Sequence, residues 1–304
     1  MTVLDTAGRE VTGIAELFDS IYVVVQKSSN LLVFSPPSTP CRRPTFELSH
    51  LNVEGLRDPS DVAAHVLEAA VGRLYVVDRA GHSIWRVEID PPSPLAATAA
   101  AVVGVFYRDA MSVRWARSVG HPSAVSVSAD GQVVVVDSRS KELSVYVDRE
   151  GRGECSVTVS LLRHGINHPL HAVLTPRRTF LVCQGTWDDM FPGLHRVSEI
   201  DGERLHTVRA CGRRRGQGPG QLSRPVHLAE GRGGGGDGSA KFVLDDHRVL
   251  MLSEQLTVLR VLVTRPTDAS NRRPHWTQRL CHAEGSGRLA VAWGGPNVHI
   301  YRIR

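Results

Sequence analysis

Short stretches in which apolar and polar residues alternate recur along the whole chain, separated by turns rich in Gly, Pro, Asp and Ser. This period of two is typical of half-buried β-strands. The stretches group into one module: a turn or small residue, a first apolar strand, a second strand such as residues 74–78 (LYVVD), and a third such as residues 84–87 (IWRV). The module begins near residues 13, 58, 121, 168, 224 and 278, which makes six copies.

Further apolar stretches lie between the copies, and we expect each to form a fourth, outer strand. They span residues 44–51, 99–107, 154–162, 204–212 and 257–264. The sixth copy has no such stretch after it, whereas Val3 and Leu4 precede the first copy. Residues near Val3 and Leu4 are therefore expected to complete the sixth unit and close a ring without an open strand edge.

The pattern predicts an all-β protein in which residues 1–304 form a single domain, a six-bladed β-propeller of four-stranded antiparallel blades. A β-sandwich is the alternative, but a sandwich does not require the same module six times. Composition agrees with strands: aromatic residues make up 6% and Met numbers 4, so Val, Leu, Ala and Ile must form the core. Branched side chains pack well on a pleated surface.

Charge and cysteine content bear on the partners and the compartment. The net charge of +5 permits an acidic partner such as RNA without requiring one. The five cysteines are widely spaced and contain no CxxC pair, which is typical of reduced thiols in a cytoplasmic or nuclear protein. The first residues lack a secretory pattern, and the longest apolar stretch, Leu95 to Tyr107, is too short to span a bilayer. We therefore expect no membrane association.

Three segments resemble the repeat of NHL-type six-bladed propellers. They are GQGPGQLSRPVHLA from Gly216, KFVLDDHRVLMLS from Lys241, and LYVVDRAGHSIWRVEID from Leu74. The chain departs from the NHL pattern where the usual Asn is missing between Arg79 and Ser83, and where a glycine run replaces a tight turn at 231–238. The resemblance implies binding of RNA or of proteins through one loop face. It also implies a channel in which some six-bladed propeller hydrolases and lyases hold calcium or zinc.

One position of the first strand is expected to face the central channel in every copy. Aligning the copies places Gly13, Asp61, Ala124, His171, His227 and Arg279 there. Imidazole with carboxylate is a plausible metal-binding or general-base set. The alternative is a water-filled channel mouth with solvated polar side chains, where Arg279 would repel a cation. We expect no cofactor, with calcium or zinc at Asp61, His171 and His227 as the alternative.

Carboxylates also end or follow the second strands, at Asp78, Asp137, Asp245 and Asp246. Asp commonly accepts hydrogen bonds from backbone N–H groups of a following turn, and we expect this structural role. The sequence contains no GxSxG, HExxH or P-loop lysine motif, and GQGPG precedes a strand rather than a helix. The established enzyme motifs therefore give no catalytic residues.

Basic residues gather on the face that carries the turns between second and third strands. The expected partner-binding residues are Arg213, Arg214, Arg215, Arg272, Arg273, Arg79, Arg139 and Arg248. Arginines can neutralise phosphates and stack on unpaired bases, although a solvated surface is the alternative. The sequence favours a non-catalytic platform for a protein or RNA partner, with no small-molecule substrate assigned. A metal-dependent hydrolase or lyase acting in the channel is the alternative function.

Overall fold

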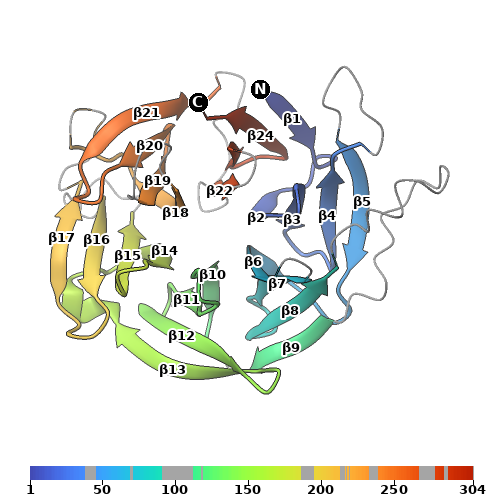
Figure 1. Ribbon diagram of the computed structural model, residues 1–304, viewed down its shortest axis with the longest axis horizontal. Helices are drawn as coiled ribbons and strands as arrows, with labels where there is room; N and C mark the ends of the chain where they lie inside the picture. The colour runs from blue at the N-terminus through green and yellow to red at the C-terminus, as the bar shows by residue number, and fades with distance from the viewer. Residues whose placement is uncertain are drawn as a thin grey trace.

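The chain folds into a ring of six β-sheets around a central axis (Figure 1). The computed structural model describes residues 1–37, 46–68, 71–90, 112–117, 119–185, 195–212, 216, 218, 220–232, 239–266, 278–283 and 287–303. Each sheet has four antiparallel strands in consecutive order, apart from the last, whose order is β1-β24-β23-β22. The predicted six-bladed propeller is therefore confirmed.

The blades are numbered from the N-terminus. Blade 1 contains β2 (Val11–Leu17), β3 (Ser20–Val25), β4 (Asn30–Ser35) and β5 (Glu47–Asn52). Blade 2 contains β6 (Pro59–Glu68), β7 (Val71–Asp78), β8 (Ser83–Ile89) and β9 (Ser112–Arg117). Blade 3 contains β10 (Pro122–Val127), β11 (Val133–Asp137), β12 (Glu142–Arg149) and β13 (Arg152–Ser160), followed by a short 3-10 helix, η1 (Leu161–His164).

Blades 4 to 6 repeat this arrangement. Blade 4 contains β14 (Pro169–Leu174), β15 (Thr179–Gln184), β16 (Arg196–Asp201) and β17 (Thr207–Cys211). Blade 5 contains β18 (Pro225–Arg232), β19 (Ser239–Asp245), β20 (Arg248–Leu252) and β21 (Val258–Thr264). Blade 6 contains β22 (Gln278–Ala283), β23 (Arg288–Trp293), β24 (Asn297–Arg302) and the N-terminal β1 (Thr2–Asp5).

The two ends of the chain meet in blade 6, as the sequence predicts. Val3 pairs with His299, and Leu4 pairs with Val298, in an antiparallel ladder. Only Leu4 faces inward: it is 4% exposed, whereas Val3 is 45% exposed. The N-terminal strand thus supplies both the outer edge of the last sheet and part of its core.

Four of the five expected outer strands lie where the sequence places them, at β5, β13, β17 and β21. The outer strand of blade 2 does not. It spans Ser112–Arg117 and pairs with β8, whereas the expected stretch, 99–107, falls outside the described residues. The apolar run at 99–107 was the stronger sequence signal. The side chains of the outer strands β13 and β21 are largely exposed, so a strand in this position needs little apolar character.

Aliphatic side chains fill the spaces between neighbouring sheets. Blades 1 and 2 share a cluster that includes Leu31 and Val33 from one sheet and Leu74 and Val76 from the other. Burying each such side chain stabilises the fold by about 1.5–3 kcal/mol. Because every sheet packs against two neighbours, the central strands are apolar on both faces.

The described cysteines contribute to packing as free thiols, since Cys183 and Cys211 belong to one core cluster and Cys281 packs against another. Cys155, Cys183, Cys211 and Cys281 are free thiols, and Cys41 lies outside the described residues. Burial raises the pKa of Cys183 and of Cys281 to about 12.

Among the described residues, no helix is long and apolar enough to cross a membrane.

Candidate functional site at the propeller axis

A backbone irregularity recurs at the start of the first strand in five blades. The strand register shifts between Val11 and Gly13, and the equivalent shifts in blades 2 to 5 end at Asp61, Ala124, His171 and His227. In blades 2 to 5 the shift begins at a proline. Proline cannot donate a hydrogen bond to the neighbouring strand, so within sheets it is confined to places such as the first residue of a strand or a bulge. Such β-bulges redirect side chains, and here they define one axial position per blade.

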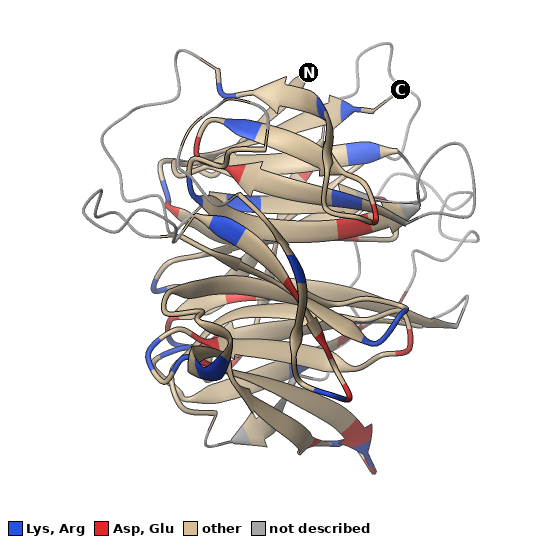
Figure 2. Cartoon of the chain, turned by 90° about the vertical axis from the view of Figure 1, so that its left-hand side faces the viewer, with Lys and Arg blue, Asp and Glu red and all other residues tan. Residues whose placement is uncertain are grey.

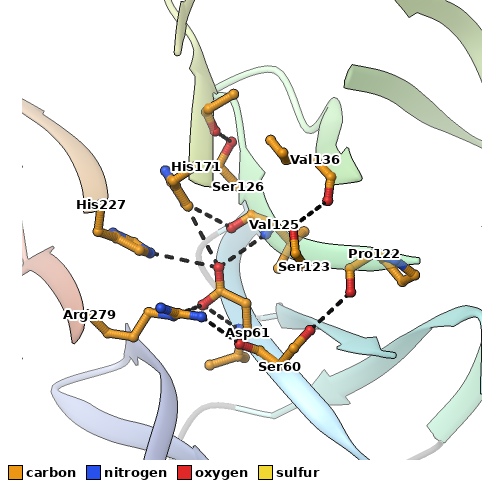
Figure 3. Close-up of polar contacts among 12 residues, drawn as sticks. Ser60, Asp61, Pro122, Ser123, Val125, Ser126, Val136, His171, His227 and Arg279 are labelled. Atoms are coloured by element: carbon orange, nitrogen blue, oxygen red, sulfur yellow. Dashed lines mark hydrogen bonds and ion pairs between the residues drawn. The ribbon is translucent and has the colours of Figure 1, made fainter. Parts of the chain in front are cut away.

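Four of these axial side chains meet in one cluster. Asp61 on β6, His171 on β14, His227 on β18 and Arg279 on β22 point toward one another, as Figure 3 shows. We call these four residues the axial cluster. The sequence alignment brings them together correctly. The alternative of solvated side chains at a channel mouth is wrong: Asp61 is 0% exposed, His171 1%, His227 6% and Arg279 7%.

Asp61 is the centre of the cluster. Its Oδ1 accepts a hydrogen bond from Arg279 Nε at 3.2 Å, and its Oδ2 accepts one from the backbone N–H of Val125 at 3.1 Å. The remaining donors of Arg279 are directed at backbone carbonyls, with Nη1 2.9 Å from Gln278 O and Nη2 2.8 Å from Ser60 O. The sequence alone predicts that Arg279 repels a cation. That prediction does not include the ion pair with Asp61, which locally neutralises the charge of Arg279.

The two histidines approach the other side of the carboxylate. His227 Nε2 lies 3.7 Å and His171 Nε2 lies 3.9 Å from Asp61 Oδ2. Their rings are tilted against each other with centroids 3.7 Å apart. His171 Nε2 also lies 3.3 Å from the carbonyl oxygen of Val125. Both imidazoles thus direct Nε2 toward a single carboxylate oxygen.

Burial sets the protonation of the cluster. Burial alone would raise the pKa of Asp61, but the Arg279 guanidinium and the two histidines reverse this effect and hold that pKa below its ordinary value. Burial also lowers the pKa of His171 and of His227, and the nearby Asp61 carboxylate offsets this only in part. The cluster at neutral pH is therefore one carboxylate, one guanidinium and two neutral imidazoles.

Small residues at the axial position make room for the cluster. Gly13 is the blade 1 equivalent, and an added Cβ there would lie 2.7 Å from the backbone nitrogen of Val62 and 2.8 Å from Asp61 Cα. Blade 1 therefore approaches blade 2 closely, and Arg279 reaches Asp61 past a neighbour without a side chain. Ala124 fills the equivalent position in blade 3.

A hollow of about 590 Å³ opens above the cluster, and we call it the axial hollow. All six blades contribute to its wall, through the beginnings of first strands and the turns between second and third strands. Arg279 lines it, together with Thr12, Ser60, Ser123 and Ser138. Sequence reasoning missed the hydroxyl residues, although Thr12, Ser60 and Ser123 each directly precede an axial position and that spacing was the available signal.

The expected partner-binding arginines are placed only in part. Arg213, Arg214, Arg215, Arg272 and Arg273 lie outside the described residues.

Three expected partner-binding arginines are described. Arg79 lines the axial hollow and donates to Asp58 at 2.8 Å. Arg139 Nη1 lies 2.8 Å from His121 Nε2. Arg248 is buried, and it donates to Asp245 and to the carbonyl of Gln221, so its guanidinium is not on the surface. On the side shown in Figure 2, basic and acidic positions are interspersed rather than gathered in one patch.

The carboxylates that end the second strands have the expected structural role. Asp78 accepts backbone hydrogen bonds from Arg57, Asp58 and Gly81. Asp137 accepts them from His121, Arg139 and Ser140. Asp245 accepts one from Asp246, whose own side chain accepts from Arg224 at 2.9 Å. These groups fix loops beside the axial hollow and are already engaged with the protein.

Comparison with known proteins supports the fold. No protein-family model matches the sequence, and no curated protein matches it. Among solved structures, a gluconolactonase from Xanthomonas campestris is 15% identical with a TM-score of 0.58, covering 98% of this chain and 88% of its own. A streptogramin B lyase is 8% identical with a TM-score of 0.55, covering 99% and 98%. The Pan2 WD40 domain of Neurospora crassa is 9% identical with a TM-score of 0.54, covering 99% and 95%. At such identities the likeness shows the six-bladed propeller fold alone.

Proposed function

We propose that this chain is an NHL-type propeller that acts as a non-catalytic binding platform, and that it receives a protruding segment of a protein partner in the axial hollow. The observation that carries the proposal is the hollow itself, because all six blades form its wall and its volume of about 590 Å³ is that of a typical ligand-binding cavity. A rigid ring suits this role, since its sheets hold the surrounding loops in fixed positions.

The lining of the hollow favours a polar protein segment. Hydroxyl groups of Thr12, Ser60 and Ser123 stand at strand beginnings, and each donates to a carbonyl of its own or the next blade. Ser138 lies on an exposed turn at the rim. A wall of this kind offers shape and hydrogen-bonding oxygens, and its two arginines, Arg79 and Arg279, are each paired with a carboxylate.

RNA is the less favoured partner for the described surface. The guanidinium groups of Arg79 and Arg248 are engaged by carboxylates, which reduces their capacity to neutralise phosphates. Among the described residues, none of the exposed large apolar side chains is aromatic, and stacking on unpaired bases needs such side chains. Of the other expected partner-binding arginines, Arg139 is exposed, and Arg213, Arg214, Arg215, Arg272 and Arg273 lie outside the described residues.

A substitution that blocks the axial hollow tests the proposal. Ser138→Trp places a large side chain at the rim, and Ser140→Trp is the matched control on the same exposed turn. Phage-displayed random peptides selected on the wild type should bind Ser140→Trp normally and Ser138→Trp at least about tenfold more weakly, the loss of about 1.4 kcal/mol. Thermal unfolding should be alike for both variants. Equal binding by the two variants, or no selectable peptide, would contradict the proposal.

A second experiment examines RNA. Fluorescence anisotropy with a labelled single-stranded RNA should show only weak binding, abolished by moderate salt. If instead tight binding is found, and Arg213→Ala with Arg214→Ala and Arg215→Ala weakens it with a shallower salt dependence, the partner is RNA and the protein-segment proposal fails.

A further inference from the structure

We propose that Asp61, His171 and His227 form a binding site for one divalent transition-metal ion, and that Zn²⁺ is the ion their donor atoms fit best. One ligand atom from each residue lies within 4.8 Å of the other two, and all three residues are buried. None of these three residues lines the axial hollow, so the proposed site does not rest on partner binding there.

The donor atoms decide the kind of metal. Two imidazole nitrogens and one carboxylate oxygen match the ligands of three-residue zinc sites. Calcium takes six to eight oxygen ligands, and Asp61 is the only carboxylate in the axial cluster, so calcium does not fit. Of the two metals named from the sequence, the structure therefore supports zinc.

The spacing of the ligands also suits a small ion. Tetrahedral zinc with bonds of about 2.0–2.1 Å separates its ligand atoms by roughly 3.4 Å. The two Nε2 atoms stand 3.7 Å and 3.9 Å from Asp61 Oδ2. These two distances would each shorten by about 0.3–0.5 Å to reach that value. The two imidazoles, whose ligand atoms lie within 4.8 Å of each other, would also have to close in on the ion.

Unsatisfied ring nitrogens are the second, independent observation. Within the part of the chain that the structure describes, His171 Nδ1 and both ring nitrogens of His227 are buried without a hydrogen-bond partner. Buried polar atoms are normally satisfied, and an unpaired one needs an explanation such as an ion. A metal bound at His227 Nε2 would supply the interaction that this atom lacks, and at His171 Nε2 it would replace the contact with the carbonyl oxygen of Val125.

Arg279 binds a different oxygen of the Asp61 carboxylate from the one that would bind the proposed ion. The guanidinium binds Asp61 Oδ1, while the histidines face Oδ2, so one oxygen remains directed at the metal position. The positive charge of Arg279 should nevertheless weaken cation binding. Arg279 lines the axial hollow and also binds Asp61, so it is the residue that connects the hollow with the proposed ion site.

Zinc titration of the chelator-stripped full chain tests the proposal. Calorimetry in the presence of a competing chelator should show one Zn²⁺ per chain. His171→Gln or His227→Gln should weaken binding by more than about 100-fold, since outer-sphere partners alone affect affinity by about 10- to 100-fold. Arg279→Gln should bind zinc more tightly than the wild type. Co²⁺ should give tetrahedral d–d absorption with the wild type and not with His227→Gln.

Controls separate this site from surface histidines. His82 is exposed and His121 is half-buried, and their rings are 4.7 Å apart, so this pair could also take zinc. The double substitution His82→Ala and His121→Ala should leave the titration unchanged. His227→Gln removes a side chain without a hydrogen-bond partner in the described chain, so we expect it to fold, as circular dichroism would verify. Unchanged zinc affinity in His227→Gln, or a folded wild type that binds no zinc, would overturn the proposal.

Discussion

Arg279 donates from Nε to Oδ1 of Asp61 across 3.2 Å, although the two residues belong to blades 6 and 2 and are 218 positions apart in the chain. Blade 1 lies between them, and its axial residue is Gly13. The contact therefore links two sheets that are not neighbours in the ring. Both side chains are buried, so the pair is a buried ion pair rather than a surface one.

Breaking this pair should destabilise the ring strongly. Asp61→Asn and Arg279→Gln should each lower the free energy of unfolding by about 3–5 kcal/mol, because each leaves a buried charge unpaired. The double variant should lose less than the sum of the two. Urea unfolding of all four proteins measures the coupling. Arg79→Gln is the control, since its pair with Asp58 is partly exposed and should contribute about 1 kcal/mol or less.

Gly13→Ala tests the close approach of blades 1 and 2. The added methyl group would lie under 3 Å from backbone atoms of Val62 and Asp61, which cannot move away independently. We expect a loss of about 1–3 kcal/mol, the usual effect of overpacking. Gly295→Ala is the matched control, because no atom lies within 4 Å of the added group. Equal melting temperatures for both variants would contradict a tight contact at the axis.

The axial histidines should make stability depend on pH. Burial lowers the pKa of both His171 and His227, next to the charges of Asp61 and Arg279, so the folded state keeps them neutral where the unfolded chain binds protons. Stability is then complete above the unfolded pKa of about 6.5 and falls as the pH drops below it.

Substitution isolates this effect from that of other groups. Urea midpoints measured between about pH 7.5 and about pH 5.5 should fall less in the double variant His171→Gln with His227→Gln than in the wild type. The measurement should be made without metal. An identical slope in both proteins would mean that the axial imidazoles are not held neutral.

Ring closure can be tested at two adjacent residues of β1. Leu4→Ala should lower the free energy of unfolding by about 2–5 kcal/mol, because Leu4 is buried against blade 1 and β24. Val3→Ala alters the solvent side of the same strand and should change it by about 0.5 kcal/mol or less. Similar effects of the two substitutions would argue against docking of β1 in the native ladder.

The fold could be predicted from the sequence because the module repeats. A second strand such as 74–78 and a polar turn recur at regular intervals, and repetition leaves few architectures open. Outer strands were harder to place. The outer strand of blade 2 spans Ser112–Arg117, a segment less apolar than 99–107, since solvent on one side relaxes the demand for alternation.

The axial site could be predicted in part for the same reason. Alignment of the copies gives the six axial positions, but it does not show whether side chains reach across the axis. Asp61 in blade 2 is covered because Arg279 reaches it from blade 6 and because Gly13 in blade 1 has no side chain in the way. Both conditions depend on how the blades pack, which the alignment does not contain. Arg248 differs from its prediction in the opposite direction. It was expected on the surface, but it is buried, and its guanidinium donates to the carbonyl oxygen of Gln221.

The bulges at the first strands have a consequence for design. The same shift occurs in blades 1 to 5 with Gly, Asp, Ala or His at its end, so the bulge itself does not depend on which of these residues stands there. Ala124 is the one of the six axial residues that carries a side chain and lies outside the axial cluster, and it is buried among apolar residues of blades 3 and 4. A carboxylate or imidazole at residue 124 would therefore be tolerated only if the axial cluster supplied a partner for it, because an unpaired polar group is costly to bury.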